Sequence, residues 1–138
     1  MASASLAHLD DLKDNAIYMR TKRKVHTGLK SALSKVRYSC KTPQRMARGI
    51  TLEVEYEELF KLLQKQNGKC AISGVVMSGL SGDPYKISID RKDSTKPYTI
   101  KNVQLVTQQV NLGKSDYTDR DFIKMCIEVA TKNGYVKK

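Results

Sequence analysis

Residues 86–114 read KISIDRKDSTKPYTIKNVQLVTQQVNLGK. Residues 86–90 alternate β-branched and polar side chains, which predicts a strand, and residues 103–106 predict a second one. The polar connection between them contains Pro97, which cannot donate to a strand ladder. Residues 107–114 then predict the first turns of a helix. The order strand, loop, strand, helix predicts an α+β protein whose C-terminal half is built on one hairpin.

Helices are expected before this stretch. Apolar residues spaced by threes, fours and eights predict a helix from about residue 11 to residue 40, which Gly28 could divide in two. Thr42 and Pro43 predict the cap and first turn of a short helix that ends at Gly49. Residues 50–54 could be a short strand or an extended entry to a helix over residues 56–66, and Asn67 with Gly68 would close that helix.

A last helix is expected after the stretch. Thr118 is followed three residues later by Asp121, which is the signature of a helix N-terminus. The predicted helix stops at Asn133 and Gly134. Its spacing predicts that it buries Phe122, Met125, Cys126, Val129 and Ala130.

The first third of the chain carries nearly all of the net charge. Residues 15–52 contain no acidic residue and carry +10 of the chain's formal +11. Charge of one sign repels itself and weakens a fold unless a polyanion is the usual partner, so nucleic acid is expected. An anionic membrane surface and plain solubility stay open as alternatives. The residues expected to contact nucleic acid are Arg20, Lys22, Arg23, Lys24, Lys30 and Arg37.

Several other classes of protein fit the sequence poorly. No run approaches the roughly 18 apolar residues that cross a bilayer. Residues 1–10 lack the basic start and apolar core of a secretory signal. Cys40, Cys70 and Cys126 are too widely spaced for a disulfide framework or a zinc ribbon. We therefore expect a cytoplasmic protein with no membrane partner.

Three polar residues fall at the edges of the predicted hairpin and helix. Asp90 ends the first strand, Asn102 precedes the second, and Asn111 lies on the helix. A hairpin packed on a helix can bring a strand-end carboxylate and a helix side chain together, and Mg²⁺ needs only one or two protein oxygens besides water and phosphate. Such a cation would stabilise charge on a scissile phosphate. Asp90 and Asp93 could instead be turn formers, and Asn111 a surface residue.

Four segments occur in a characteristic order: NGKCAISG (67–74), ISIDRKD (87–93), YTIKNVQLV (98–106) and VNLGK (110–114). Their order and spacing resemble the HNH endonucleases, most closely the small phage and bacterial variety whose first motif reads Ile-Asp-Arg. The resemblance spans roughly residues 50–130. It implies a ββα-metal module within residues 50–138, preceded by a basic helical nucleic-acid-binding region over residues 1–49.

The resemblance also implies roles for single residues. Asp90 falls at the metal-binding aspartate and Asn111 at the second metal ligand, with Mg²⁺ or Mn²⁺ as the cofactor. Asn102 falls at the asparagine that braces the loop between the strands, and Lys114 could contact phosphate. The implied activity is hydrolysis of DNA, expected to be double-stranded, in a bacterial or phage-infected cell.

Arg91 departs from the family pattern, which has a histidine there as general base. The only histidines are His8 and His26, both outside the module. Arginine stays protonated, so Arg91 could hold a phosphate or pair with a carboxylate but could not accept a proton. Asp93 is the candidate base, unless metal-bound water needs none. The alternative is a non-catalytic DNA- or RNA-binding protein on a degenerate HNH scaffold.

Overall fold

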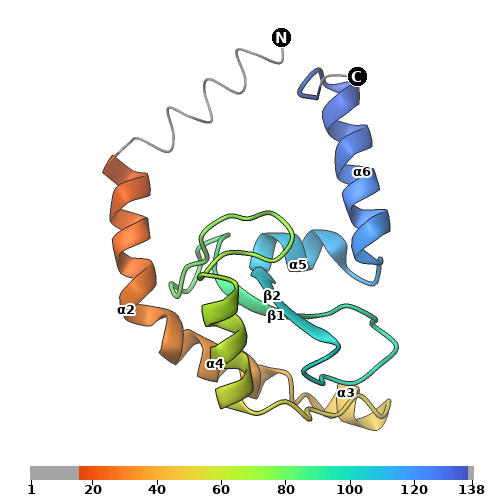
Figure 1. Cartoon of the computed structure of the whole chain (residues 1–138). Coiled ribbons are helices and arrows are strands. Elements are labelled where there is room, and N and C mark those ends of the chain that lie inside the picture. The colour runs from red at the N-terminus through yellow and green to blue at the C-terminus, as the bar shows by residue number, and fades with distance from the viewer. Residues whose placement is uncertain (1–15, 137–138) are drawn as a thin grey trace.

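The computed structural model describes residues 16–136, and side chains from residue 28 onward. The elements are α2 (Ala16–Ser39), α3 (Pro43–Ala47), α4 (Tyr56–Lys65), β1 (Ile87–Arg91), β2 (Val103–Thr107), α5 (Gln108–Lys114) and α6 (Asp119–Lys132) (Figure 1). Strands β1 and β2 form a two-stranded antiparallel sheet. These elements confirm the α+β class.

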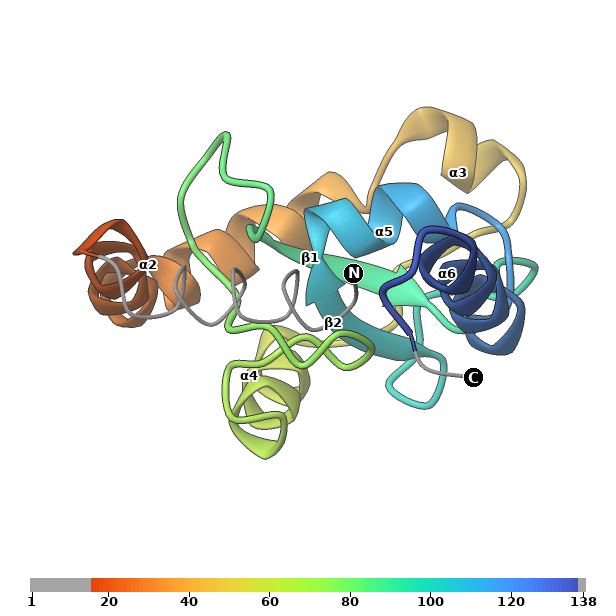
Figure 2. The same cartoon turned by 90° about the horizontal axis from the view of Figure 1, so that it is seen from above.

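The hairpin is the centre of the fold. Its register pairs Ile89 with Leu105 and Asp90 with Gln104, and every residue of β2 is buried. Thr107 ends β2 and also caps α5, because its side chain accepts a hydrogen bond from the backbone N–H of Val110. The helix therefore starts where the strand ends. Figure 2 shows the hairpin lying between α5 on one side and α4 on the other.

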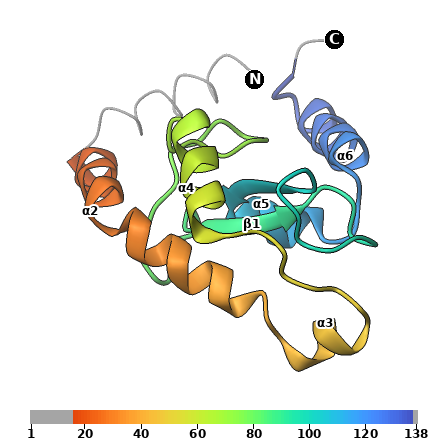
Figure 3. The same ribbon diagram turned by 60° about the horizontal axis from the view of Figure 1, so that its bottom comes forward.

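One apolar core joins the two halves of the chain. Helix α2 runs along β1 toward α3 (Figure 3). Leu33 from α2, Leu59 from α4 and Leu105 from β2 are fully buried in the same cluster. The described residues of the regions predicted as 1–49 and 50–138 thus contribute to the same core.

Most of the local predictions before the hairpin are confirmed. Thr42 caps α3 by accepting a hydrogen bond from the backbone N–H of Arg45. After α4, Asn67 and Gly68 both adopt positive φ angles, of 56° and 69°. Residues 50–54 form an extended entry, in which Leu52 makes only an isolated bridge to Tyr98.

The division of the first helix at Gly28 is wrong, because α2 continues through it, although the helix bends part-way along its length (Figure 1). Gly28 has a packing role instead. A Cβ added at Gly79 would lie 2.5 Å from the carbonyl carbon of Gly28, so two backbones meet there. No helix within residues 16–136 is long and apolar enough to cross a bilayer.

The burial predicted for the last helix is mostly wrong. Phe122 is buried, but Met125, Cys126 and Val129 are exposed. Figure 1 shows the cause, since α6 extends away from the hairpin and packs only near its start, against α5. The apolar spacing correctly predicted a helix, but it could not predict that this helix would lie apart from the core.

Candidate active site

Asp90 lies near the end of β1 and is only 4 % exposed. Its Oδ2 accepts hydrogen bonds from Lys114 Nζ, at 2.5 Å, and from Gln104 Nε2, at 2.8 Å. Its Oδ1 has no hydrogen-bond partner among the described residues. Every fully buried polar side-chain atom of those residues has a partner, so Oδ1 is not fully buried. Oδ1 is therefore accessible from the pocket that Asp90 lines.

Lys114 anchors this carboxylate from α5. Its side chain is 1 % exposed, and its Nζ also lies 2.8 Å from Asp119 Oδ1 and 3.2 Å from the carbonyl oxygen of Arg91. Burial lowers the pKa of Lys114, but the hydrogen bonds that its ammonium donates to Asp119 and Asp90 outweigh this effect and raise the pKa above its ordinary value. The lysine therefore stays charged. Its predicted contact with phosphate does not fit this burial, because both carboxylates already enclose the ammonium group.

Asn111 reaches the same pocket from the preceding turn of α5. Its Nδ2 donates a hydrogen bond of 2.7 Å to Ser88 Oγ, which fixes the amide plane. In the described part of the chain its Oδ1 accepts no hydrogen bond. The pocket has a volume of about 260 Å³. Asp90 and Asn111 both line this pocket, and each has one oxygen that accepts no hydrogen bond from a described residue: a carboxylate oxygen in Asp90 and the amide oxygen in Asn111.

Arg91 follows Asp90 at the end of β1 and lines the same pocket. Its Nη1 donates to the carbonyl oxygens of Ser94 and Lys96, and its guanidinium carbon lies 5.1 Å from the centre of the Tyr98 ring. These contacts hold one edge of the guanidinium and leave the Nε–Nη2 edge for a ligand.

Asp93 does not join the site. Its Oδ1 accepts hydrogen bonds from the backbone N–H and the hydroxyl of Thr95, at 3.0 Å and 2.6 Å. Those two bonds, with a smaller contribution from Lys96, lower the pKa of Asp93. It does not line the pocket that contains Asp90. The structure therefore gives no support to the base role predicted for Asp93, and the residue has the contacts of the turn former that the alternative interpretation described.

Asn102 spans the loop between the strands. Its Oδ1 accepts from the backbone N–H of Asp93 at 3.0 Å, and its Nδ2 donates to the carbonyl oxygens of Asp93 and Pro97 at 3.0 and 2.9 Å. These are the hydrogen bonds of a structural brace. Asn102 shapes the loop and lies outside the pocket.

The predicted nucleic-acid contacts of α2 lie in different surroundings. Lys30 is exposed, and its ammonium lies over the Phe60 ring. Arg37 is used internally, because its Nε donates to the carbonyl oxygen of Val54 at 2.9 Å and its Nη2 lies 3.5 Å from Glu55. The nucleic-acid contact predicted for Arg37 is therefore not supported. Four residues lie in α2 with side chains outside the described part of the chain: Arg20, Lys22, Arg23 and Lys24.

Three features of the site escaped the sequence interpretation. Asp116 lines the pocket and adds a second carboxylate to it. Gln104 donates to both Asp90 and Asp119 and so links strand to helix. Arg45, from α3, also lines the pocket. A signal was present for Gln104, a polar residue inside a buried strand, whereas nothing local in the sequence places Arg45 or Asp116 beside Asp90.

The pocket residues suit a hard cation such as Mg²⁺. Asp90, Asn111 and Asp116 supply carboxylate and amide oxygens, which are the donors that Mg²⁺ prefers. Among residues 28–136, no three His, Cys, Asp or Glu side chains form a metal-binding group. A cation held here would thus rely on a few of these oxygens and on water, which is the sparse coordination typical of sites completed by substrate phosphate.

The chain matches no protein-family model, no curated protein and no solved structure.

Proposed function

We propose that this chain is a Mg²⁺-dependent endonuclease that hydrolyses DNA in a ββα-metal, HNH-type module made of β1, β2 and α5. One observation carries the proposal. Asp90 on β1 and Asn111 on α5 line the same pocket, and each keeps one oxygen unengaged while its other polar atom is fixed. Mg²⁺ or Mn²⁺ bound by these oxygens would stabilise charge on the scissile phosphate and the leaving oxygen.

The other residues of the site have roles in the same scheme. Lys114 and Gln104 fix Asp90 through its Oδ2 and leave its Oδ1 unengaged. Arg91 engages the phosphate through the edge of its guanidinium that the loop carbonyls leave available. Asp116 takes the place of Asp93 as the candidate base, since it is the other carboxylate that lines the pocket.

A plasmid-nicking assay with Mg²⁺ or Mn²⁺ tests this proposal. Asp90→Asn keeps the shape of the buried side chain, and Asn111→Ala removes the amide. Each should reduce nicking by about 100-fold or more. Asp116→Asn should reduce it by about 10²–10⁴-fold if Asp116 is the base. Asp93→Ala is the matched control and should nick normally. Nicking that survives both Asp90→Asn and Asn111→Ala would overturn the site.

The alternative is a non-catalytic DNA- or RNA-binding protein on the same scaffold. The observation in its favour is that the pocket contains no histidine, while Lys114 already neutralises part of the charge on Asp90. Salt-dependent binding of duplex DNA without any nicking would favour this alternative. Tight binding of structured RNA with no preference for duplex DNA would identify RNA as the partner.

A further inference from the structure

Two arginines from distant parts of the chain approach one buried tyrosine ring. The guanidinium carbon of Arg45 lies 5.9 Å from the centre of the Tyr98 ring, and that of Arg91 lies 5.1 Å from it. Tyr98 is 3 % exposed. Both arginines and Tyr98 line the pocket that contains Asp90. The ring therefore serves as a support that brings two cations to the same pocket wall.

We infer that Arg45 and Arg91 form a phosphate clamp at this pocket, with Arg45 as a phosphate-binding residue supplied by α3. The inference rests on the proposed function, because it names how that site would hold the backbone of its nucleic-acid substrate. It also assigns to the basic N-terminal region a direct contact with the substrate at the site of the reaction.

The charge balance favours an anion between the two arginines. Among the described residues, neither guanidinium forms a salt bridge with a carboxylate, although Asp90 and Asp116 line the same pocket. The carboxylate of Asp90 is instead paired with Lys114. Two unpaired cations repel each other, and a phosphodiester between them would relieve that repulsion while accepting bidentate hydrogen bonds from each fork.

Both guanidinium groups are oriented before any ligand binds. Arg45 Nη1 donates to the carbonyl oxygen of Ser39 at 3.3 Å, and Arg91 Nη1 donates to the carbonyl oxygens of Ser94 and Lys96. A guanidinium has five N–H donors, so each group keeps several for a ligand. Because backbone carbonyls and the Tyr98 ring already fix the side chains, little rotamer entropy is lost when phosphate binds.

The clamp reads the backbone and not the bases. The Tyr98 ring is buried beside both guanidinium groups and cannot stack on a base, and the N–H donors of Arg45 and Arg91 would be engaged by phosphate oxygens. Contacts of this kind position a nucleic acid without selecting its sequence. The clamp would therefore place a phosphate next to the oxygens of Asp90 and Asn111, whatever the neighbouring bases are.

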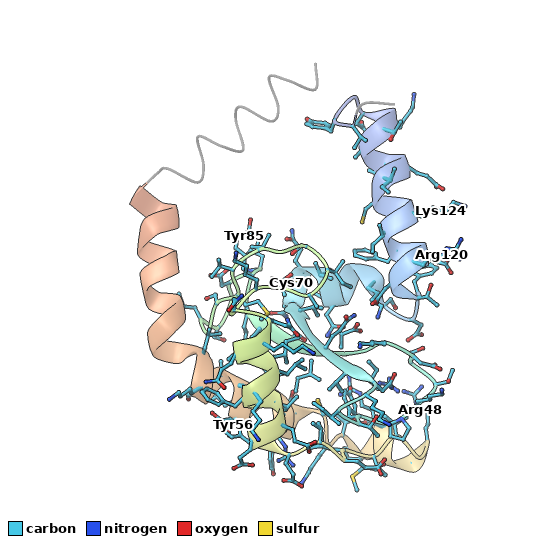
Figure 4. The ribbon with its side chains drawn as sticks, in the orientation of Figure 1. Arg48, Tyr56, Cys70, Tyr85, Arg120 and Lys124 are labelled. Carbon is cyan, nitrogen blue, oxygen red and sulfur yellow. The ribbon has the colours of Figure 1, made fainter. Side chains whose placement is uncertain are left out.

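Arg48 offers a matched control for Arg45. Arg48 is the C-cap residue of α3, three residues after Arg45 (Figure 4), and it has the same charge. It is exposed and does not line the pocket. Binding of a fluorescent duplex oligonucleotide to the full chain would be measured by anisotropy, in EDTA and over a range of salt concentrations. Arg45→Ala should weaken binding by about 10-fold or more and reduce the log–log salt slope by about 0.9. Arg48→Ala should change the affinity by less than about 3-fold.

Equal losses for Arg45→Ala and Arg48→Ala would overturn the clamp, because general charge would then explain the binding. Thermal melts would show whether Arg45→Ala folds. If it does not, Arg45→Lys and Arg48→Lys decide, since both keep the charge and only the first should lose affinity. Nicking with Mg²⁺ separates the two proposals. An Arg45-specific loss of binding in a chain that never nicks supports the clamp and contradicts the nuclease. Nicking by a chain that shows no Arg45-specific loss of binding contradicts the clamp alone.

Discussion

Asp90 and Asp93 are three residues apart in one motif, yet they lie in opposite surroundings. Asp90 is buried on the hairpin, paired with Lys114 from α5, and open through one oxygen to a pocket. Asp93 lies beyond the end of β1, with 44 % of its side chain exposed, and caps a turn at Thr95. The position of each carboxylate relative to the end of the strand, and not its spacing along the chain, therefore decides which one can take part in chemistry.

The largest expected effect lies on the Asp90 side of this comparison. Lys114→Met removes the ammonium group and leaves a buried carboxylate without its main partner. We expect a loss of about 3–5 kcal/mol in the free energy of unfolding, measured by urea denaturation in EDTA. Adding Asp90→Asn to the same chain should recover part of this loss, because the unpaired charge is removed.

Lys124→Met is the control for this experiment. Lys124 pairs with Glu128 on α6 at 3.6 Å, with 76 % and 64 % of the two side chains exposed, and Figure 4 shows Lys124 projecting from that helix. Its loss should cost at most about 1 kcal/mol. Similar losses for Lys114→Met and Lys124→Met would mean that the Asp90 network does not behave as a buried ion pair.

An intermediate effect on stability is expected in the loop that joins β1 to β2 and contains Asp93. Asn102→Ala removes four hydrogen bonds that tie the loop to itself at Asp93, Lys96 and Pro97. Leaving these partly buried backbone groups without partners should cost about 1–3 kcal/mol in urea denaturation. Asn133→Ala removes one exposed side-chain hydrogen bond after α6 and should cost less. Equal costs would show that Asn102 does not brace the loop.

The sequence predicted the local structural features around these residues well. Strand alternation predicted that Asp90 lies at the end of the first strand, and the helix caps at Thr42 and Thr118 are where the residue types predicted them. These features depend on a few neighbouring residues, whose backbone preferences are strong. The position of Asp90 and Asn111 beside the same pocket was also predictable, because α5 directly follows the hairpin in the chain.

Long-range packing decided what the sequence could not. Lys114 was expected to contact phosphate, but α5 docks so that its side chain is enclosed by two carboxylates. Arg45 reaches the pocket only because α3 folds back toward Tyr98. The apolar face of α6 predicted burial, whereas residues such as Val129 remain exposed. Each error concerns which surface an element meets, and periodicity alone carries no information on that point.

The smallest expected effect concerns Asp93, and its sign depends on pH. Because hydrogen bonds with Thr95 lower the pKa of Asp93 below 3.8, the charged carboxylate stabilises the folded chain above that value, and this stabilisation is lost as the pH falls through the folded-state pKa. Asp93→Ala should therefore melt at a lower temperature than the wild type at pH 7. The difference should shrink below about pH 4.

Thr95→Val is the matched variant, since it removes the hydroxyl donor and keeps the side-chain shape. It should weaken the pH dependence that Asp93 contributes, because the bond that favours the charged form is lost. Neither variant should alter plasmid nicking. A melting difference that stays constant from pH 7 down to about pH 2 would show that the turn does not depend on the charge of Asp93. A large loss of nicking in Asp93→Ala would return this residue to the catalytic site and remove the contrast with Asp90.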